Sequence, residues 1–106
     1  MEEAENKKCD VYIALGSNLG DRLALLKQAF VSLKREIAEM CVSSVYESEP
    51  MYDRNQGNFL NAVLYGRTSL QPHELLDLCQ EIEKKLGRTR NKDRRNGPRL
   101  IDVDIL

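Results

Sequence analysis

Residues 11–21 read VYIALGSNLGD, and this stretch sets the start of the fold. Its first five residues are apolar and end at a glycine-rich turn, a pattern typical of a short buried strand. Asp21 then provides a side chain of the kind that commonly caps the N-terminus of a helix. We therefore expect a strand followed directly by a helix.

Apolar residues after Asp21 recur at spacings of three and four, which predicts one stripe of an amphipathic helix. The stripe consists of Leu23, Leu26, Phe30, Leu33 and Ile37. Two segments rich in β-branched and aromatic residues, 41–47 and 58–68, come next. They predict two strands of a hairpin joined by the polar loop 50–57.

A second helix and a last strand complete the pattern. Pro72 suits the first turn of a helix and Gly87 suits its end. The stripe of this helix consists of Leu75, Cys79, Ile82 and Leu86. A basic segment, 88–99, then leads into the apolar run 101–105. The order βαββαβ predicts an α+β ferredoxin-like sandwich, in which a four-stranded antiparallel sheet carries both helices on one face.

The chain of 106 residues is long enough for one domain, and we expect a flexible tail over 1–9 and a folded domain over 10–106. No apolar run approaches the roughly 20 residues that span a bilayer, so we expect no membrane segment. The three cysteines have no CxxC spacing, and we expect no secretory leader before them. This favours a cytoplasmic protein in which Cys9, Cys41 and Cys79 are small buried side chains.

Asp102 and Asp104 stand two residues apart within the apolar run 101–105. In a strand both carboxylates project from one face, with Cα atoms roughly 6–7 Å apart. One alternative is simply a strand with an acidic solvent face. Aspartate is depleted in strands, however, and two close carboxylates repel each other unless a cation offsets their charge. The pair is therefore a candidate site for one or two hard cations such as Mg²⁺.

Residues 88–99 carry six basic side chains and one acidic one, whereas the whole chain has a formal net charge of −1. This local positive charge indicates an anion site rather than a surface that coats nucleic acid, although many charge runs are merely solvated. Arginine binds phosphate oxygens in pairs, and Mg²⁺ combines one or two carboxylates with substrate phosphates. The loop and the aspartates together predict phosphoryl-type transfer. The sequence lacks the P-loop motif GxxxxGK[ST], which excludes that class of enzyme.

Phe59 and Asn61 share one face of the expected strand 58–68, since they are two residues apart. A phenylalanine in a strand is more often part of the core. The alternative is that its ring stacks on a flat heterocycle while the neighbouring amide forms hydrogen bonds with the ring edge.

Four motifs make the sequence similar to the 6-hydroxymethyl-7,8-dihydropterin pyrophosphokinase family. They are residues 16–22 (GSNLGDR), 59–62 (FLNA), 87–90 (GRTR) and 97–106 (GPRLIDVDIL). The resemblance implies a ferredoxin-like fold. It also implies a diphosphokinase of folate biosynthesis, which transfers pyrophosphate from ATP to the hydroxymethyl group of a dihydropterin and leaves AMP.

The resemblance implies a role for each matching residue. Asp102 and Asp104 would hold two Mg²⁺ ions and, with Arg88 and Arg99, form the catalytic set. The nucleotide would be bound by Gln80, Glu83, Arg88, Arg90, Arg95 and Arg99. The pterin would be bound by Ser48, Glu49, Met51, Phe59 and Asn61.

Two features differ from the family pattern. Asn96 stands where many members have an aromatic residue that packs toward the pterin. Family members also continue past the last strand into a segment that supplies a histidine, further basic residues and a second aromatic side chain. We therefore expect a truncated form of the domain with an incomplete site, weakly active or inactive.

Two other classes of function stay open on the sequence. A ferredoxin-like domain can be a small-ligand regulatory module without catalysis, and such a module would not need Asp102 and Asp104. An RNA-binding sheet would display several aromatic side chains, whereas only 6% of the residues are aromatic. We expect small-molecule substrates, with neither nucleic acid nor a membrane as partner. The resemblance also points to fusion of this domain to other folate-pathway enzymes, or to association with them.

Overall fold

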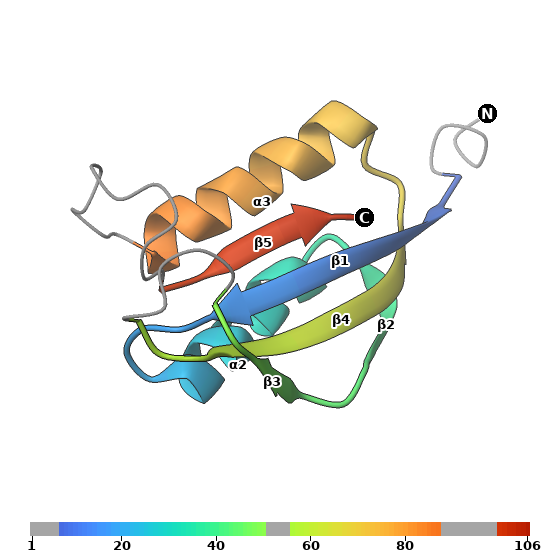
Figure 1. The fold of residues 1–106 in the computed structure, drawn as a ribbon. Coiled ribbons are helices and arrows are strands. Elements are labelled where there is room, and N and C mark those ends of the chain that lie inside the picture. Colours follow the sequence, from blue (N-terminus) through green and yellow to red (C-terminus); the bar gives the residue numbers. More distant parts are fainter. Residues whose placement is uncertain (1–6, 51–55, 88–99) are drawn as a thin grey trace.

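The computed structural model describes residues 7–50, 56–87 and 100–106. Its elements are β1 (Cys9–Ser17), α2 (Arg22–Lys34), β2 (Ala38–Val42), β3 (Tyr46–Ser48), β4 (Phe59–Thr68), α3 (Pro72–Leu86) and β5 (Asp102–Ile105). Figure 1 shows one twisted sheet with the two helices packed together against it. The α+β ferredoxin-like sandwich predicted from the sequence is confirmed.

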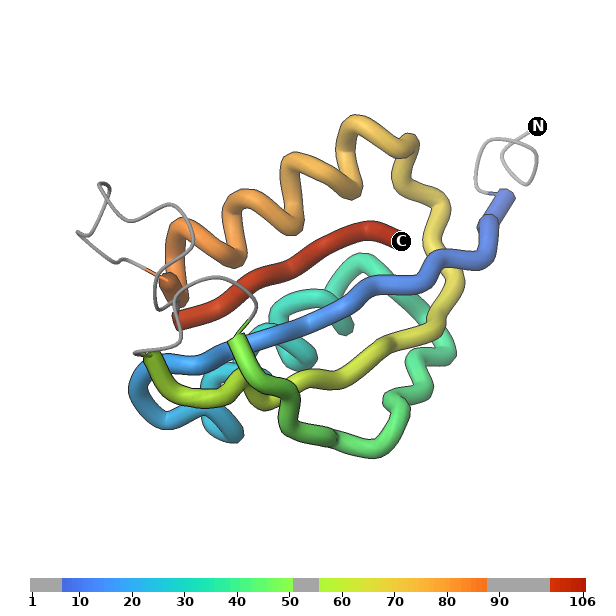
Figure 2. Tube along the Cα trace, viewed as in Figure 1, coloured from blue at the N-terminus to red at the C-terminus, as the bar shows by residue number. Residues whose placement is uncertain are grey.

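The sheet is antiparallel throughout, with the strand order β2-β4-β1-β5 and with β3 also paired to β4. The longest ladder joins β1 to β4 and ends where Ser17 lies opposite Leu60. β5 runs along the other edge of β1, with Asp102 opposite Gly16 (Figure 2). The last strand of the chain is therefore next to the first.

The expectation of one unbroken strand over 41–47 is wrong, because two short strands, β2 and β3, share this edge of β4. β2 begins at Ala38, where its register with β4 shifts and Glu39 has a positive φ of 56°. Ser43 then interrupts the ladder, since its hydroxyl oxygen accepts a hydrogen bond from Val63 N–H at 2.9 Å. A side chain thus takes the place of a backbone carbonyl, and the strand divides.

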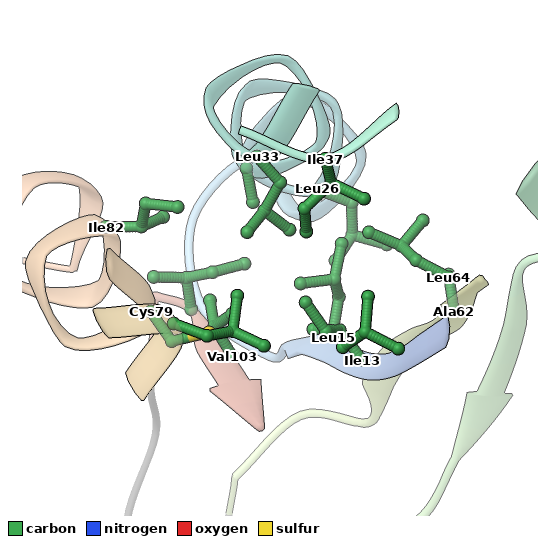
Figure 3. Packing of buried hydrophobic residues seen from close by; sticks show 14 residues of the cluster. Ile13, Leu15, Leu26, Leu33, Ile37, Ala62, Leu64, Cys79, Ile82 and Val103 are labelled. Carbon is green, nitrogen blue, oxygen red and sulfur yellow. The ribbon is translucent and has the colours of Figure 1, made fainter. Parts of the chain in front are cut away.

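The hydrophobic core lies between the sheet and the two helices (Figure 3). Alternate residues of the strands point into it, as the two-residue period of a strand requires. The strands contribute Val11, Ile13, Leu15, Ala62, Leu64 and Val103. The helices contribute Leu26, Ala29 and Leu33 from α2 and Leu75, Cys79 and Ile82 from α3.

The stripe predicted for the first helix is correct at its centre and wrong at its ends. Leu26 and Leu33 are buried, but Leu23 is 46% exposed at the edge of the core. Ile37 is buried as expected, yet it lies beyond the end of α2 at Lys34. The helix therefore stops earlier than its apolar spacing suggests.

The cysteines do not share one environment. Cys79 is buried, but Cys9 and Cys41 are exposed, so the expectation of three buried cysteines is wrong for two of them. Cys9 is also the first residue of β1, where it pairs with Thr68. The sheet thus begins inside the range 1–9 expected as a tail.

Local signals set the helix ends as expected. Asp21 Oδ1 accepts a hydrogen bond from Ala24 N–H at 3.2 Å, which caps α2. α3 begins with Pro72, and Gln71 N–H just before it donates to Glu74 Oε1 at 2.7 Å. In the described part of the chain, neither helix has the length and apolar character needed to cross a membrane.

Candidate active site

The face of the sheet opposite the helices brings predicted site residues onto neighbouring strands. Val103 is buried on the helix side of β5, so Asp102 and Asp104 belong to the opposite face. Asp102 pairs with Gly16 of β1, and Gly16 pairs in turn with Asn61 of β4. Directly paired residues of antiparallel strands share a face. Asp102, Gly16 and Asn61 therefore form one row across the sheet.

Gly16 keeps the centre of this row free of a side chain. Adjacent strands are about 4.8 Å apart, which separates the backbones at Asp102 and Asn61 by about 10 Å. A Cβ atom at Gly16 would lie 3.4 Å from Asn61 Oδ1 and 3.5 Å from Phe59 Cδ1. The amide and the ring thus both lie next to the bare backbone of Gly16.

Asn61 is held in one orientation by β3. Its Nδ2 donates to Ser48 Oγ at 2.9 Å and to the carbonyl oxygen of Tyr46 at 3.3 Å. With the amide nitrogen bonded to β3, Oδ1 is the atom that lies near Gly16. This oxygen is placed to accept a hydrogen bond from a ligand above the row.

The structure brings three of the five residues predicted for the pterin together. Phe59 and Asn61 lie on one face of β4, and Ser48 is bonded to Asn61 from β3. Glu49 directly follows β3 and is exposed. Met51 lies outside the described residues.

The aspartate pair has the donor set that Mg²⁺ prefers. Asp102 is half-buried and Asp104 is exposed, so their oxygens can be reached from the open face. Within residues 7–50, 56–87 and 100–106, no group of three or more His, Cys, Asp or Glu side chains could hold a metal ion by itself. Mg²⁺ commonly takes one or two carboxylates and completes its shell with phosphate oxygens and water. The pair fits an ion that arrives with a polyphosphate.

Glu83, predicted for the nucleotide, contacts the aspartate strand. Its Oε2 accepts a hydrogen bond at 2.7 Å from the N–H of Val103, the residue between the two aspartates. Gln80 lies nearly one turn earlier on α3 and is exposed. The C-terminal part of α3 is thus joined to β5.

A thiol beside this contact is kept neutral. Burial raises the pKa of Cys79 to about 11, and the negative charges of Glu83 and Asp104 act in the same direction. In Figure 3 Cys79 lies next to Val103 in the core. Because only a thiolate is a good nucleophile, Cys79 belongs to the packing and not to the chemistry.

The basic segment falls on residues that the structure does not describe. Arg88, Arg90, Arg95 and Arg99 all lie outside the described residues, as does Asn96. Their phosphate-binding roles stay predictions.

Sequence reasoning missed the contacts of two residues near the site, Asn18 and Arg22. Their side chains hydrogen-bond residues that are 36 to 39 positions away in the sequence. Such contacts leave no local periodicity. The one available signal was that both residues belong to the motif 16–22.

Comparison with known sequences places the chain in a family. A sequence model of the 7,8-dihydro-6-hydroxymethylpterin-pyrophosphokinase (HPPK) family matches residues 12–106. A 2-amino-4-hydroxy-6-hydroxymethyldihydropteridine pyrophosphokinase of Bacillus subtilis is 50% identical over 97 residues, which are 90% of this chain and 57% of that protein. Its counterpart in Aquifex aeolicus is 47% identical over 97 residues, with coverage of 91% and 59%. A folate synthesis bifunctional protein of Arabidopsis thaliana is 46% identical over 98 residues, with coverage of 92% and 20%.

The chain spans 57% to 59% of the length of these two bacterial relatives. The matched region contains all five strands of the sheet except the first residues of β1, and with them the row from Asp102 to Asn61. The resemblance noted in the sequence is thereby confirmed. This chain belongs to the 7,8-dihydro-6-hydroxymethylpterin-pyrophosphokinase family.

Proposed function

We propose that this chain supplies nucleotide and pterin sites of a pyrophosphokinase of folate biosynthesis, which transfers the terminal diphosphate of ATP to 6-hydroxymethyl-7,8-dihydropterin. The observation that carries the proposal is the row Asp102–Gly16–Asn61. It brings the carboxylate that would bind a cation and the amide that would bind the pterin ring onto one open face, about two strand spacings apart. A phosphate donor and a flat acceptor bound there would meet above Gly16.

The reaction requires positioning more than covalent chemistry from the protein. The pterin hydroxyl oxygen forms a bond to the β-phosphorus of ATP, and the bond from that phosphorus to the oxygen of AMP breaks. The hydroxyl gives up its proton to solvent water, and the products are AMP and the pterin diphosphate. Two Mg²⁺ ions, when bound, neutralise polyphosphate charge. Asp102 and Asp104 would hold them.

The pterin would be bound on the β3–β4 side of the row. The ring of Phe59 would stack on the heterocycle, and Asn61 Oδ1 would accept a hydrogen bond from its edge. Support comes from the bond between Ser48 Oγ and Asn61 Nδ2, which fixes the amide. Glu49 and Met51 would contribute mainly backbone groups.

The nucleotide would be bound on the other side, where α3 meets β5. Gln80 and Glu83 lie on that helix. The basic segment 88–99 connects α3 to β5, and the bond from Val103 N–H to Glu83 joins the two elements that flank it. This supports roles on the phosphates for its arginines: Arg88 and Arg99 in the catalytic set, with Arg90 and Arg95 closing over the phosphates.

Two observations concern the fusion of this domain to others and the compartment in which it occurs. The Arabidopsis thaliana relative is named as a bifunctional folate synthesis protein, which supports joining of this domain to another folate-synthesis domain. The three cysteines are free, and two of them are exposed. Free exposed thiols fit a reducing cytoplasm.

Calorimetric titration with Mg²⁺ and α,β-methylene-ATP, with and without the dihydropterin, tests the proposal. The methylene bridge blocks the bond that would break. We expect wild-type protein to bind the nucleotide analogue and then the pterin. Asp102→Asn keeps the shape but removes a charge, so analogue affinity should fall roughly tenfold or more. Asp77→Asn, an exposed position on α3, is the matched control and should bind as wild type does.

Two outcomes would contradict the proposal. One is a pterin affinity that is the same in wild type and Asp102→Asn, together with no Mg²⁺-dependent nucleotide binding. This result would assign the chain to the small-ligand regulatory class. Absence of binding for both ligands would show that this chain does not supply the sites.

A further inference from the structure

The segment 17–22 does more than lead from β1 into α2, because one of its side chains reaches the residues just before β4. Asn18 is only 6% exposed. Its Nδ2 donates to Gln56 Oε1 at 2.6 Å and to the carbonyl oxygen of Gly57 at 3.2 Å. A buried amide with two such acceptors fixes local geometry, since removing the donor deprives both acceptors of a partner.

Arg22, the first residue of α2, makes a second link to the same region. Its Nη1 lies 2.9 Å from the carbonyl oxygen of Asn58 and 2.9 Å from Glu47 Oε2. One guanidinium thus joins the start of α2 to β3 and to the residue before β4. Arginine suits this position because its planar fork directs several N–H groups at separate acceptors.

Both links act at the end of the sheet where the row from Asp102 to Asn61 lies. Asn18 follows Gly16 by two residues, and the bonded Gly57 precedes Phe59 by two residues. The ladder between β1 and β4 ends just here, at the pair Ser17 and Leu60. Beyond that pair, the side chains of Asn18 and Arg22 form hydrogen bonds that join the two segments.

We propose that Asn18 and Arg22, together the turn clamp, are positioning residues for pterin recognition. They hold the entrance of β4 so that Phe59 and Asn61 face the space above Gly16. The inference rests on the proposed function for the identity of the ligand. The sheet has its register from the β1–β4 ladder without the turn clamp, so the clamp acts on the site more than on the fold.

Asn18→Asp tests the turn clamp, since it preserves size and removes the donor to Gln56 and Gly57. Gln28→Glu makes the same amide-to-carboxylate change at an exposed position of α2 and serves as the control. In calorimetry with Mg²⁺ and α,β-methylene-ATP present, pterin affinity should fall roughly tenfold in Asn18→Asp. Affinity for the nucleotide analogue should change by less than about twofold, because the aspartate strand is not touched.

Arg22→Ala is the second variant, and Lys34→Ala at the other end of α2 is its control. Arg22 is partly exposed, so its removal should not prevent folding. In NMR spectra without ligand, the side-chain amide of Asn61 and the ring of Phe59 should shift in both turn-clamp variants and in neither control. These ligand-free spectra test the turn clamp even if wild-type protein binds no pterin. Absence of pterin binding would count against the proposed function and not against the turn clamp.

The turn clamp would be overturned by equal losses of pterin and nucleotide affinity, which would mean that these residues merely stabilise the fold. It would also be overturned by Asn61 and Phe59 resonances that stay at their wild-type positions in Asn18→Asp and Arg22→Ala.

Discussion

Glu83 has one observed contact and one predicted role. The family resemblance assigns it to the nucleotide, and its carboxylate also accepts the hydrogen bond from Val103 N–H. In the described part of the sheet, β5 pairs only with β1, so its far edge has no strand beside it. A helix side chain takes that place, and it does so at the peptide between Asp102 and Asp104.

Removal of the Glu83 carboxylate should make the folded protein less stable. We expect Glu83→Ala to lower the free energy of unfolding by about 1–3 kcal/mol, because a buried N–H loses its acceptor. Glu83→Gln keeps an acceptor oxygen and should recover most of the loss. Urea denaturation measures both, with Glu81→Ala, exposed on the same helix, as the control. A loss in Glu83→Ala no larger than that of the control would contradict this role.

β4 is packed so closely by the chain around β2 that a side chain at Gly66 would force its neighbours to shift. A Cβ atom at Gly66 would overlap Ile37 Cγ2, and it would lie 3.1 Å from Met40 Cγ and 3.2 Å from the carbonyl oxygen of Ala38. The segment that enters β2 therefore lies directly over this strand. The bulge at Glu39 belongs to the same close approach.

Gly66→Ala should destabilise the protein by about 1–3 kcal/mol through overpacking. Gly16→Ala is the matched control, since it makes the same change in a strand on the open face, where the new methyl would come no closer than 3.4 Å to another side chain. Its stability should stay near that of wild type. Thermal unfolding followed by circular dichroism compares the two variants. The packing argument fails if Gly66→Ala proves as stable as Gly16→Ala.

Elements with one buried face were predictable from the sequence, and elements shaped by distant contacts were not. α3 follows its apolar spacing, and α2 does so at its centre, because burial of one face selects that spacing. β1 and β4 were indicated by their apolar, β-branched and aromatic content. The division between β2 and β3 depends on Ser43 meeting Val63, a contact set by tertiary structure. In the site, the shared faces of Asp102 with Asp104 and of Phe59 with Asn61 followed from strand parity. Their alignment through Gly16 required the register of three strands.

The molecule as a whole uses the same strands for two purposes. On β5, Val103 enters the core while Asp102 belongs to the open face, and on β1 Leu15 and Gly16 divide in the same way. A slip of one residue would carry an aspartate into the core, so the core enforces the register on which the row depends. Stability and site geometry are therefore coupled.

The reactivity of the Cys79 thiol reports whether solvent reaches the core. It is 1% exposed, whereas Cys9 and Cys41 are exposed. In native protein, Ellman's reagent should react rapidly with two thiols, and with the third only as fast as the protein unfolds. Raising the pH from 7 to 9 should not release it, because burial raises the pKa of Cys79 to about 11. Three thiols of equal reactivity would mean that α3 does not close over β5.

The same raised pKa predicts how stability depends on pH. The folded-state pKa lies above the ordinary value of 9.0, so folding favours the neutral thiol. The stability that the buried neutral thiol contributes is fully present below pH 9 and is lost as the pH rises through about 11. Urea denaturation of wild type and Cys79→Ala at pH 8, 9, 10 and 11 isolates it, because both proteins keep every other titrating group. Wild type should lose its advantage over the variant across this range; a constant difference would show that Cys79 is already accessible to water in the folded protein.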